Sequence, residues 1–166
     1  MASLPDADKL CEQLARELKA QVKASTAMVG IHTGGAWLAE RLHAALGMQE
    51  PLGLLDIAFY RDDYAKQGLA KDPKRSRIPF DVEGRDLLLV DDVLHTGRTV
   101  RAALNELFDY GRPASIALVV LAERGGRPLP ICAQFAGARV EVPAGMRLRL
   151  KRDDKGKLSL ELERGA

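Results

Sequence analysis

Two wholly apolar segments constrain the fold of this 166-residue chain more than any other feature of its sequence. Residues 87–90 read Leu-Leu-Leu-Val, and residues 115–121 are apolar from Ile116 onward. A strand with one face in water alternates polar and apolar residues, so both segments are predicted to be strands buried on both faces. Helical periodicity follows at residues 99–110 and stops at Gly111. Buried strands that alternate with helices predict an α/β fold, with a mostly parallel sheet between helices.

The N-terminal part of the chain repeats this alternation. Ser3, with an acid three residues later, predicts the start of an amphipathic helix that runs to about residue 23. Residues 28–31 are predicted to form a buried strand and residues 36–46 a helix. A further strand is expected over residues 52–60.

Periodicity is lost after residue 60, where basic residues gather among glycine and proline. Unstructured segments of this length are uncommon inside compact domains unless they act as lids or binding loops. Residues 61–80 are therefore predicted to be a mobile basic loop, and a solvated linker is the alternative.

The C-terminal part has the pattern of a β-hairpin at the edge of the fold. Apolar residues alternate on both sides of a possible turn at residues 153–156, which predicts a hairpin over residues 146–162. Its cations are interpreted as those of a solvated edge strand, with an RNA-binding surface as the alternative. They are Arg147, Arg149, Lys151 and Arg152.

Length and composition bound the remaining possibilities. The chain is expected to form a single domain over residues 1–166. A net charge of +2 excludes a protein that coats polyanions, and the longest apolar run of seven residues is far below the ~20 of a membrane-spanning helix. The N-terminus has no export signal, so a cytoplasmic location is expected.

Cys11 and Cys132 have no metal-site spacing, and no protein-held metal is predicted.

The richest chemistry lies where the first apolar strand ends. Asp91 and Asp92 follow it directly, and residues 96–99, Thr-Gly-Arg-Thr, open the next helix. Unpaired N–H groups at a helix start bind phosphate, Gly97 allows close backbone approach, and Arg98 adds positive charge. The two acids would repel a phosphate, so we expect them to face hydroxyls or a metal-bridged part of the same ligand. The alternative is that they cap the helix.

In a parallel sheet, ligands bind beyond the carboxyl ends of the strands. The loops that reach this edge are predicted at residues 33–35, 91–99 and 123–127. Neither GxxxxGK[ST] nor GxGxxG occurs, so neither a Walker-type ATPase nor a dinucleotide-binding dehydrogenase is supported.

Residues 87–99 resemble the signature of type I phosphoribosyltransferases that binds 5-phosphoribosyl 1-pyrophosphate (PRPP): an apolar strand, paired acids and a TGxT loop. Similarity extends from about residue 28 to residue 150 and resembles the PyrR family, regulators of pyrimidine operons with uracil phosphoribosyltransferase activity. It is carried by residues 29–33, 55–57, 60–63, 99–102, 111–113, 124–125 and 129–131.

This resemblance implies the type I phosphoribosyltransferase fold, with a flexible active-site loop and a C-terminal hairpin. It implies that uracil and PRPP give UMP and pyrophosphate, with Mg²⁺ held mainly by PRPP. A homodimer or higher homo-oligomer is expected. The alternative is a regulator of pyrimidine gene expression that senses nucleotides with little turnover.

The resemblance also assigns site residues. Asp91 and Asp92 would be catalytic and would contact the ribose hydroxyls, residues 96–99 would hold the 5-phosphate, and residues 33–35 would be the pyrophosphate loop. The residues implied to bind PRPP or UMP are Thr33, Gly34, Gly35, Arg61, Asp91, Asp92, Val93, Leu94, His95, Thr96, Gly97, Arg98, Thr99, Arg124 and Val140.

Two departures from the family pattern carry consequences. Gly34 stands where the family usually has arginine, which predicts weaker pyrophosphate binding. Gly126 and Cys132 replace polar or basic residues of the RNA-binding members, which leaves Arg127 as the one cation of that trio. Since phosphate-contacting cations supply much of the affinity for RNA, these substitutions argue against RNA attenuation.

Overall fold

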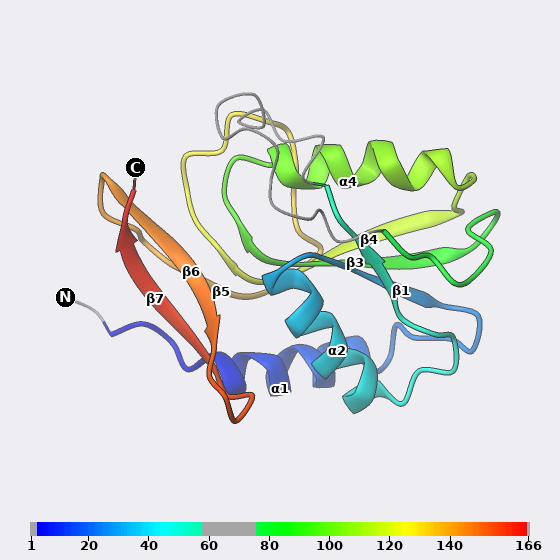
Figure 1. The fold of residues 1–166 in the computed structure, drawn as a ribbon, viewed down its shortest axis with the longest axis horizontal. Helices are drawn as coiled ribbons and strands as arrows, with labels where there is room; N and C mark the ends of the chain where they lie inside the picture. Colours follow the sequence, from blue (N-terminus) through cyan, green and yellow to red (C-terminus); the bar gives the residue numbers. More distant parts are fainter. Residues whose placement is uncertain (1–2, 58–75, 166) are drawn as a thin grey trace.

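The computed structural model describes residues 3–57 and 76–165 and contains a five-stranded sheet and a separate two-stranded one (Figure 1). Every neighbouring pair in the order β2-β1-β3-β4-β5 is parallel, and β6 pairs with β7 antiparallel. The strands are β1 (Ala27–Ile31), β2 (Gly53–Leu55), β3 (Asp86–Leu94), β4 (Ser115–Glu123), β5 (Phe135–Arg139), β6 (Met146–Arg152) and β7 (Leu158–Arg164). The helices are α1 (Ala7–Leu18), α2 (Gly34–Leu46) and α4 (Arg98–Asp109). Arg61 and most of the predicted mobile loop lie outside the described residues.

Helices cover both faces of the central sheet, as predicted. α1 and α2 lie on one face and α4 lies on the other (Figure 1). Leu88 and Val90 of β3 belong to the core on the α1 and α2 side, whereas Leu87 and Leu89 belong to the core on the α4 side. Because alternate residues of β3 enter two different cores, this strand has no polar position along its buried length.

The first helix is shorter than its sequence predicts at both ends. Its cap is Asp6 rather than Ser3, since the Asp6 carboxylate accepts hydrogen bonds from the N–H groups of Asp8 and Lys9, at 2.9 and 3.2 Å. The helix stops at Leu18 and not near residue 23. Leu18 is the last residue of its buried stripe, and the next three residues are exposed, so nothing packs against a further turn.

The edges of the sheet also differ from prediction. β2 is a short strand, and β5 has no counterpart among the predicted elements. β5 contains Gly137, where a Cβ would lie 2.5 Å from the Leu121 carbonyl oxygen of β4. This close approach needs glycine, since even the Cβ of alanine would clash, and a short segment rich in glycine and alanine carries little strand signal.

The predicted C-terminal hairpin is present but does not join the central sheet. Its apolar residues pack into the core on the α1 and α2 side, so the hairpin stands over that end of the molecule. These residues are Leu148, Leu150, Leu158 and Leu160. Across residues 3–57 and 76–165, the structure contains no helix with the length and apolarity that crossing a bilayer requires.

The strand order creates a switch point between β1 and β3. The chain leaves β1 through α2 toward β2, and leaves β3 through α4 toward β4 on the opposite face. The two connections therefore diverge, and a crevice opens beyond the carboxyl ends of β1 and β3. This position is where the predicted ligand loops meet.

Glu106, on α4, is an ionisable residue buried in the protein. Its side chain is buried and one carboxylate oxygen has no hydrogen-bond partner among the described residues. Burial raises the pKa of Glu106 above 4.5, and a hydrogen bond from Ser76 opposes the shift. The folded state therefore holds the proton more tightly than the unfolded state, and the resulting stabilisation is lost as the pH rises through the raised pKa.

We expect Glu106→Gln, which removes the charge and keeps the shape, to raise Tm at pH 8 more than at pH 4.5. Thermal melts at both values measure the difference, with Asp154→Asn in the exposed hairpin turn as the control. An equal change in Tm at the two pH values would contradict this account of Glu106.

Candidate active site

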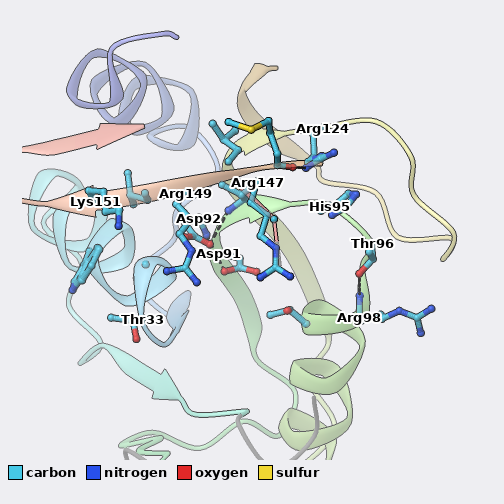
Figure 2. Close-up of a pocket in the computed structure, with 18 of the residues that line it drawn as sticks. Thr33, Asp91, Asp92, His95, Thr96, Arg98, Arg124, Arg147, Arg149 and Lys151 are labelled. Carbon is cyan, nitrogen blue, oxygen red and sulfur yellow. Dashed lines mark hydrogen bonds between the residues drawn. The ribbon is translucent and has the colours of Figure 1, made fainter. Parts of the chain in front are cut away.

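A cavity of about 1020 Å³ lies at the switch point between β1 and β3. Its walls come from the start of α2, the end of β3, the start of α4, the residue after β4 and strand β6 (Figure 2). The cavity brings together most of the predicted site residues. They are Thr33, Gly34, Asp91, Asp92, Val93, His95, Thr96, Arg98, Thr99 and Arg124.

Four other predicted residues do not line this cavity. Leu94 lies in the core beneath α4, and Val140 lies in the core on the α1 and α2 side. Gly35 and Gly97 allow close packing next to the cavity, because a Cβ on either one would clash with neighbouring atoms. The fifteenth predicted residue, Arg61, belongs to the part of the chain that the structure does not describe.

The paired acids lie inside β3 and not after it. Asp91 is 5% exposed, and its Oδ1 accepts a hydrogen bond from the Asp92 N–H at 2.9 Å. Asp92 Oδ1 accepts from the Val93 N–H at 2.8 Å. The alternative that this pair caps the following helix is wrong, since the cap of α4 is Gly97. The strand instead presents two carboxylates to the cavity.

The start of α4 is left open toward the cavity. Gly97 has φ +88° and contributes no side-chain cap to the helix. Thr96 Oγ1 accepts a hydrogen bond from the Arg98 N–H at 3.2 Å, and Thr96, Arg98 and Thr99 all line the cavity. A Cβ at Gly97 would lie 2.8 Å from Cγ1 of Ile131, so only glycine fits both the backbone and this neighbour. The helix start therefore offers N–H groups, hydroxyls and a cation to an anion.

The loop between β1 and α2 packs directly against the acids. α2 begins at Gly34, two residues before its predicted start. A Cβ at Gly35 would lie 2.7 Å from the Val90 carbonyl oxygen and 2.9 Å from the Asp91 Cα, so α2 touches the β3 backbone there. A Cβ at Gly34 would lie 2.7 Å from Cγ of Asp92. The Asp92 carboxylate thus occupies the space that a side chain at residue 34 would need.

Three cations of β6 line the cavity, which sequence analysis did not predict. Leu148 and Leu150 are buried in the core, although both also line the cavity, and the alternating residues Arg147, Arg149 and Lys151 face it (Figure 2). Arg147 and Arg149 are exposed to solvent, as the prediction of a solvated edge strand requires, and the structure adds that this strand borders the cavity. Alternation of cations with leucines is visible in the sequence, but which face meets the site depends on how the hairpin docks.

Positive charge also surrounds His95. Burial lowers the pKa of His95 below 6.5, and the charges of Arg124, Arg127 and Arg147 lower it further. The imidazole is therefore neutral at neutral pH.

The described residues contain no group of three or more histidine, cysteine, aspartate or glutamate side chains placed to hold a metal ion. Cys11 is a buried free thiol, and Cys132 is an exposed one.

Comparison with known proteins agrees with this geometry. Residues 2–140 match the family model described as phosphoribosyl transferase domain. Proteins named bifunctional protein PyrR are similar over nearly the whole chain. The protein from Pseudomonas paraeruginosa is 49% identical over 166 residues, covering 98% of this chain and 95% of the relative. That from Nitrosococcus oceani is 47% identical over 154 residues, covering 92% and 87%. The chain belongs to the PyrR family.

Solved structures confirm the predicted fold. A purine phosphoribosyltransferase from Pyrococcus horikoshii is 26% identical, with a TM-score of 0.61 and coverage of 81% of this chain and 82% of that one. A hypoxanthine-guanine phosphoribosyltransferase from Bacillus anthracis is 16% identical, with a TM-score of 0.66 and coverage of 84% of both chains. The fold is that of the type I phosphoribosyltransferases, and the predicted membership of the PyrR family is confirmed.

In this PyrR-family chain, Arg127 has a structural role. Its guanidinium donates to the carbonyl oxygens of His95 at 3.2 Å, Ile131 at 3.1 Å and Arg124 at 3.4 Å. It also lies 3.6 Å from the Glu123 carboxylate. These contacts join the loop after β3 to the loop after β4, and they engage the one cation that remained of the expected RNA-contacting trio.

The two glycines at the start of α2 are expected to behave differently. Gly35→Ala meets backbone atoms that cannot move aside, and this overpacking should cost about 1–3 kcal/mol in the free energy of unfolding. Gly34→Ala meets the Asp92 side chain, which can rotate, so stability should change little while phosphoribosyl transfer falls at least about tenfold. Urea unfolding and turnover of PRPP measure the two effects, and equal loss of stability in both variants would contradict the packing described.

NMR titration should place the pKa of His95 below 6.5, with Arg147→Gln moving it back toward 6.5. Arg149→Gln is the matched control because Arg149 is not among the charges that shift His95. A His95 pKa unaffected by loss of the Arg147 charge would mean that Arg147 does not face this end of the cavity.

Proposed function

We propose that this chain transfers the phosphoribosyl group of PRPP to uracil, giving UMP and pyrophosphate. One observation carries the proposal: the paired acids of β3 and the open start of α4 line the same cavity. A ligand that suits both must carry hydroxyls and a phosphate on one small frame, as a ribose 5-phosphate does. The choice of uracil rests on membership of the PyrR family.

The start of α4 would hold the 5-phosphate. Its first-turn N–H groups, the hydroxyls of Thr96 and Thr99 and the Arg98 side chain all lie at this wall. Asp91 and Asp92 would accept hydrogen bonds from the ribose hydroxyls, because a carboxylate repels phosphate and binds O–H donors well. The loop at residues 33–35 would meet the pyrophosphate with backbone N–H groups.

Arg124 would contact the base. Its Nη1 donates to the Met146 carbonyl oxygen at 3.1 Å, which holds the side chain at the cavity wall. Its Nε is buried and has no hydrogen-bond partner among the residues that the structure describes. Buried donors are normally paired, so an acceptor on the ligand, such as a uracil carbonyl oxygen, would complete this group.

In the reaction, the bond between C1 of the ribose and the pyrophosphate oxygen breaks, and a bond from C1 to the uracil nitrogen forms. The electron pair of the broken bond leaves with pyrophosphate, and the proton of the uracil nitrogen passes to the released pyrophosphate or to solvent water. Positive charge develops on the ribose ring, where the Asp91 and Asp92 carboxylates would stabilise it.

Mg²⁺ fits this site as a companion of PRPP. Asp91 and Asp92 place hard oxygen donors at the wall, yet the described residues offer no complete set of metal ligands. The ion would therefore be held mainly by PRPP oxygens, with these carboxylates in support. When bound, it supplies charge neutralisation for the departing pyrophosphate.

Assays of UMP formation from uracil and PRPP test the proposal. Asp91→Asn and Asp92→Asn should each lower kcat about 10²- to 10³-fold, because a fixed negative charge beside the developing positive charge is lost. Asp154→Asn in the exposed hairpin turn is the matched control, and melts monitor stability. Near-parent kcat in either site variant would contradict its catalytic role.

A nucleotide-sensing regulator is the second candidate, because the relatives are named bifunctional. The same cavity could bind a nucleotide as a signal or as a substrate, so a measurement of turnover distinguishes a regulator from a transferase. UMP binding in calorimetry together with absent UMP formation would favour the regulator.

A further inference from the structure

Strand β6 crosses the cavity from the end of β4 to α2. At its first residue, the Met146 carbonyl oxygen accepts a hydrogen bond from Arg124, which follows β4. At its last residue, the guanidinium of Arg152 lies 4.8 Å from the ring centroid of Trp37 and 3.4 Å from the Glu40 carboxylate, both on α2. These anchors set the order of the β6 side chains along the cavity.

The cations of β6 that face the cavity therefore form a row with two distinct ends. This row, the β6 ladder, consists of Arg147, Arg149 and Lys151. Arg147 lies at the His95 end, since its charge lowers the pKa of that imidazole. Lys151 lies at the α2 end, next to the residue that packs on Trp37, and Arg149 lies between them (Figure 2). The last two cations thus stand over the side of the cavity formed by the β1–α2 loop.

A pyrophosphate group on that side of the cavity needs positive charge, and no other lysine or arginine among the described residues lines that side. The β1–α2 loop contributes His32, Thr33 and Gly34, none of which is a lysine or an arginine, beside the Asp92 carboxylate. Besides the β6 ladder, the arginines and lysines that line the described cavity are Arg98, on α4, and Arg124, after β4. A pyrophosphate group against the β1–α2 loop would meet backbone N–H groups but little charge without β6.

We propose that Arg149 and Lys151 bind the pyrophosphate group of PRPP, opposite the N–H groups of the β1–α2 loop. This inference rests on the proposed function and extends it to residues of the hairpin. Cations on a strand above the site take the place of a charged side chain at residue 34, whose position is filled by the Asp92 carboxylate.

Glu163 of β7 is the counter-ion of this pair. Its carboxylate lies 3.4 Å from Arg149 Nε and 2.5 Å from Lys151 Nζ. Glu161, opposite Arg149 in the hairpin register, shares this face, but neither glutamate lines the cavity. Glu163 therefore holds both cations in place and competes with an incoming anion for them.

Binding of inorganic pyrophosphate with Mg²⁺, measured by calorimetry on the full chain, tests the proposal without requiring turnover. Arg149→Gln and Lys151→Gln should each weaken pyrophosphate binding about three- to tenfold, since each removes one solvent-accessible charge-assisted contact. Affinity for UMP, which has no pyrophosphate, should stay the same. Lys23→Gln is the charge-matched control, because Lys23 pairs with Asp86 at the opposite end of β3.

Glu163→Gln should change pyrophosphate affinity in the opposite direction. Loss of the competing carboxylate should tighten pyrophosphate binding, and a variant that merely damaged the hairpin would weaken it. Unchanged pyrophosphate affinity in Arg149→Gln and Lys151→Gln would overturn the inference, as would equal weakening of UMP.

The same measurements distinguish failure of the proposed transfer to uracil from failure of the proposed pyrophosphate site. A wild-type chain that makes no UMP, while its pyrophosphate affinity still falls in the two hairpin variants, would refute transfer to uracil and support the anion site. A chain that makes UMP, with pyrophosphate affinity unaffected by the variants, would refute the anion site and leave the transfer intact.

Discussion

The parallel pairing of β1 with β3 is the contact on which the site depends. The pairing sets Ala27 beside Leu87 and Gly30 beside Val90, so both strands end at the same edge of the sheet. The helices that follow them leave on opposite faces, and the crevice between them becomes the cavity. The absence of a Cβ at Gly35 lets α2 start against the β3 backbone, which brings the β1–α2 loop to the paired acids.

The charges of the cavity are divided between its walls. The end of β3 carries two carboxylates, while α4, β4 and β6 contribute cations around them. Such a division suits a ligand that carries hydroxyls in its middle and phosphates at its ends, as PRPP does. Leu148 and Leu150 of β6 pack the hairpin against the core. The residues that alternate with them on the same strand carry the positive charges at the cavity.

Features that depend on contacts between neighbours along the chain are predictable from the sequence. An apolar run, two acids and Thr-Gly-Arg-Thr are consecutive, and the strand, turn and helix they form place ten of the predicted residues in one cavity. Features that depend on packing between distant segments are not predictable in this way. Asp6 replaces Ser3 as the cap of α1, and β5 forms because Gly137 can approach Leu121. Val140 and Leu94 lie in the cores, which no local pattern separates from a site wall.

The sequence by itself determined the class of fold, the phosphate-binding helix start and the pair of acids, because each depends on neighbours along the chain. Only the tertiary structure decided that the hairpin docks with Arg147, Arg149 and Lys151 toward the cavity. A two-residue alternation specifies two faces but not which one meets which surface. That choice follows from burial of Leu148 and Leu150 against the α1 and α2 core, a contact between segments more than a hundred residues apart.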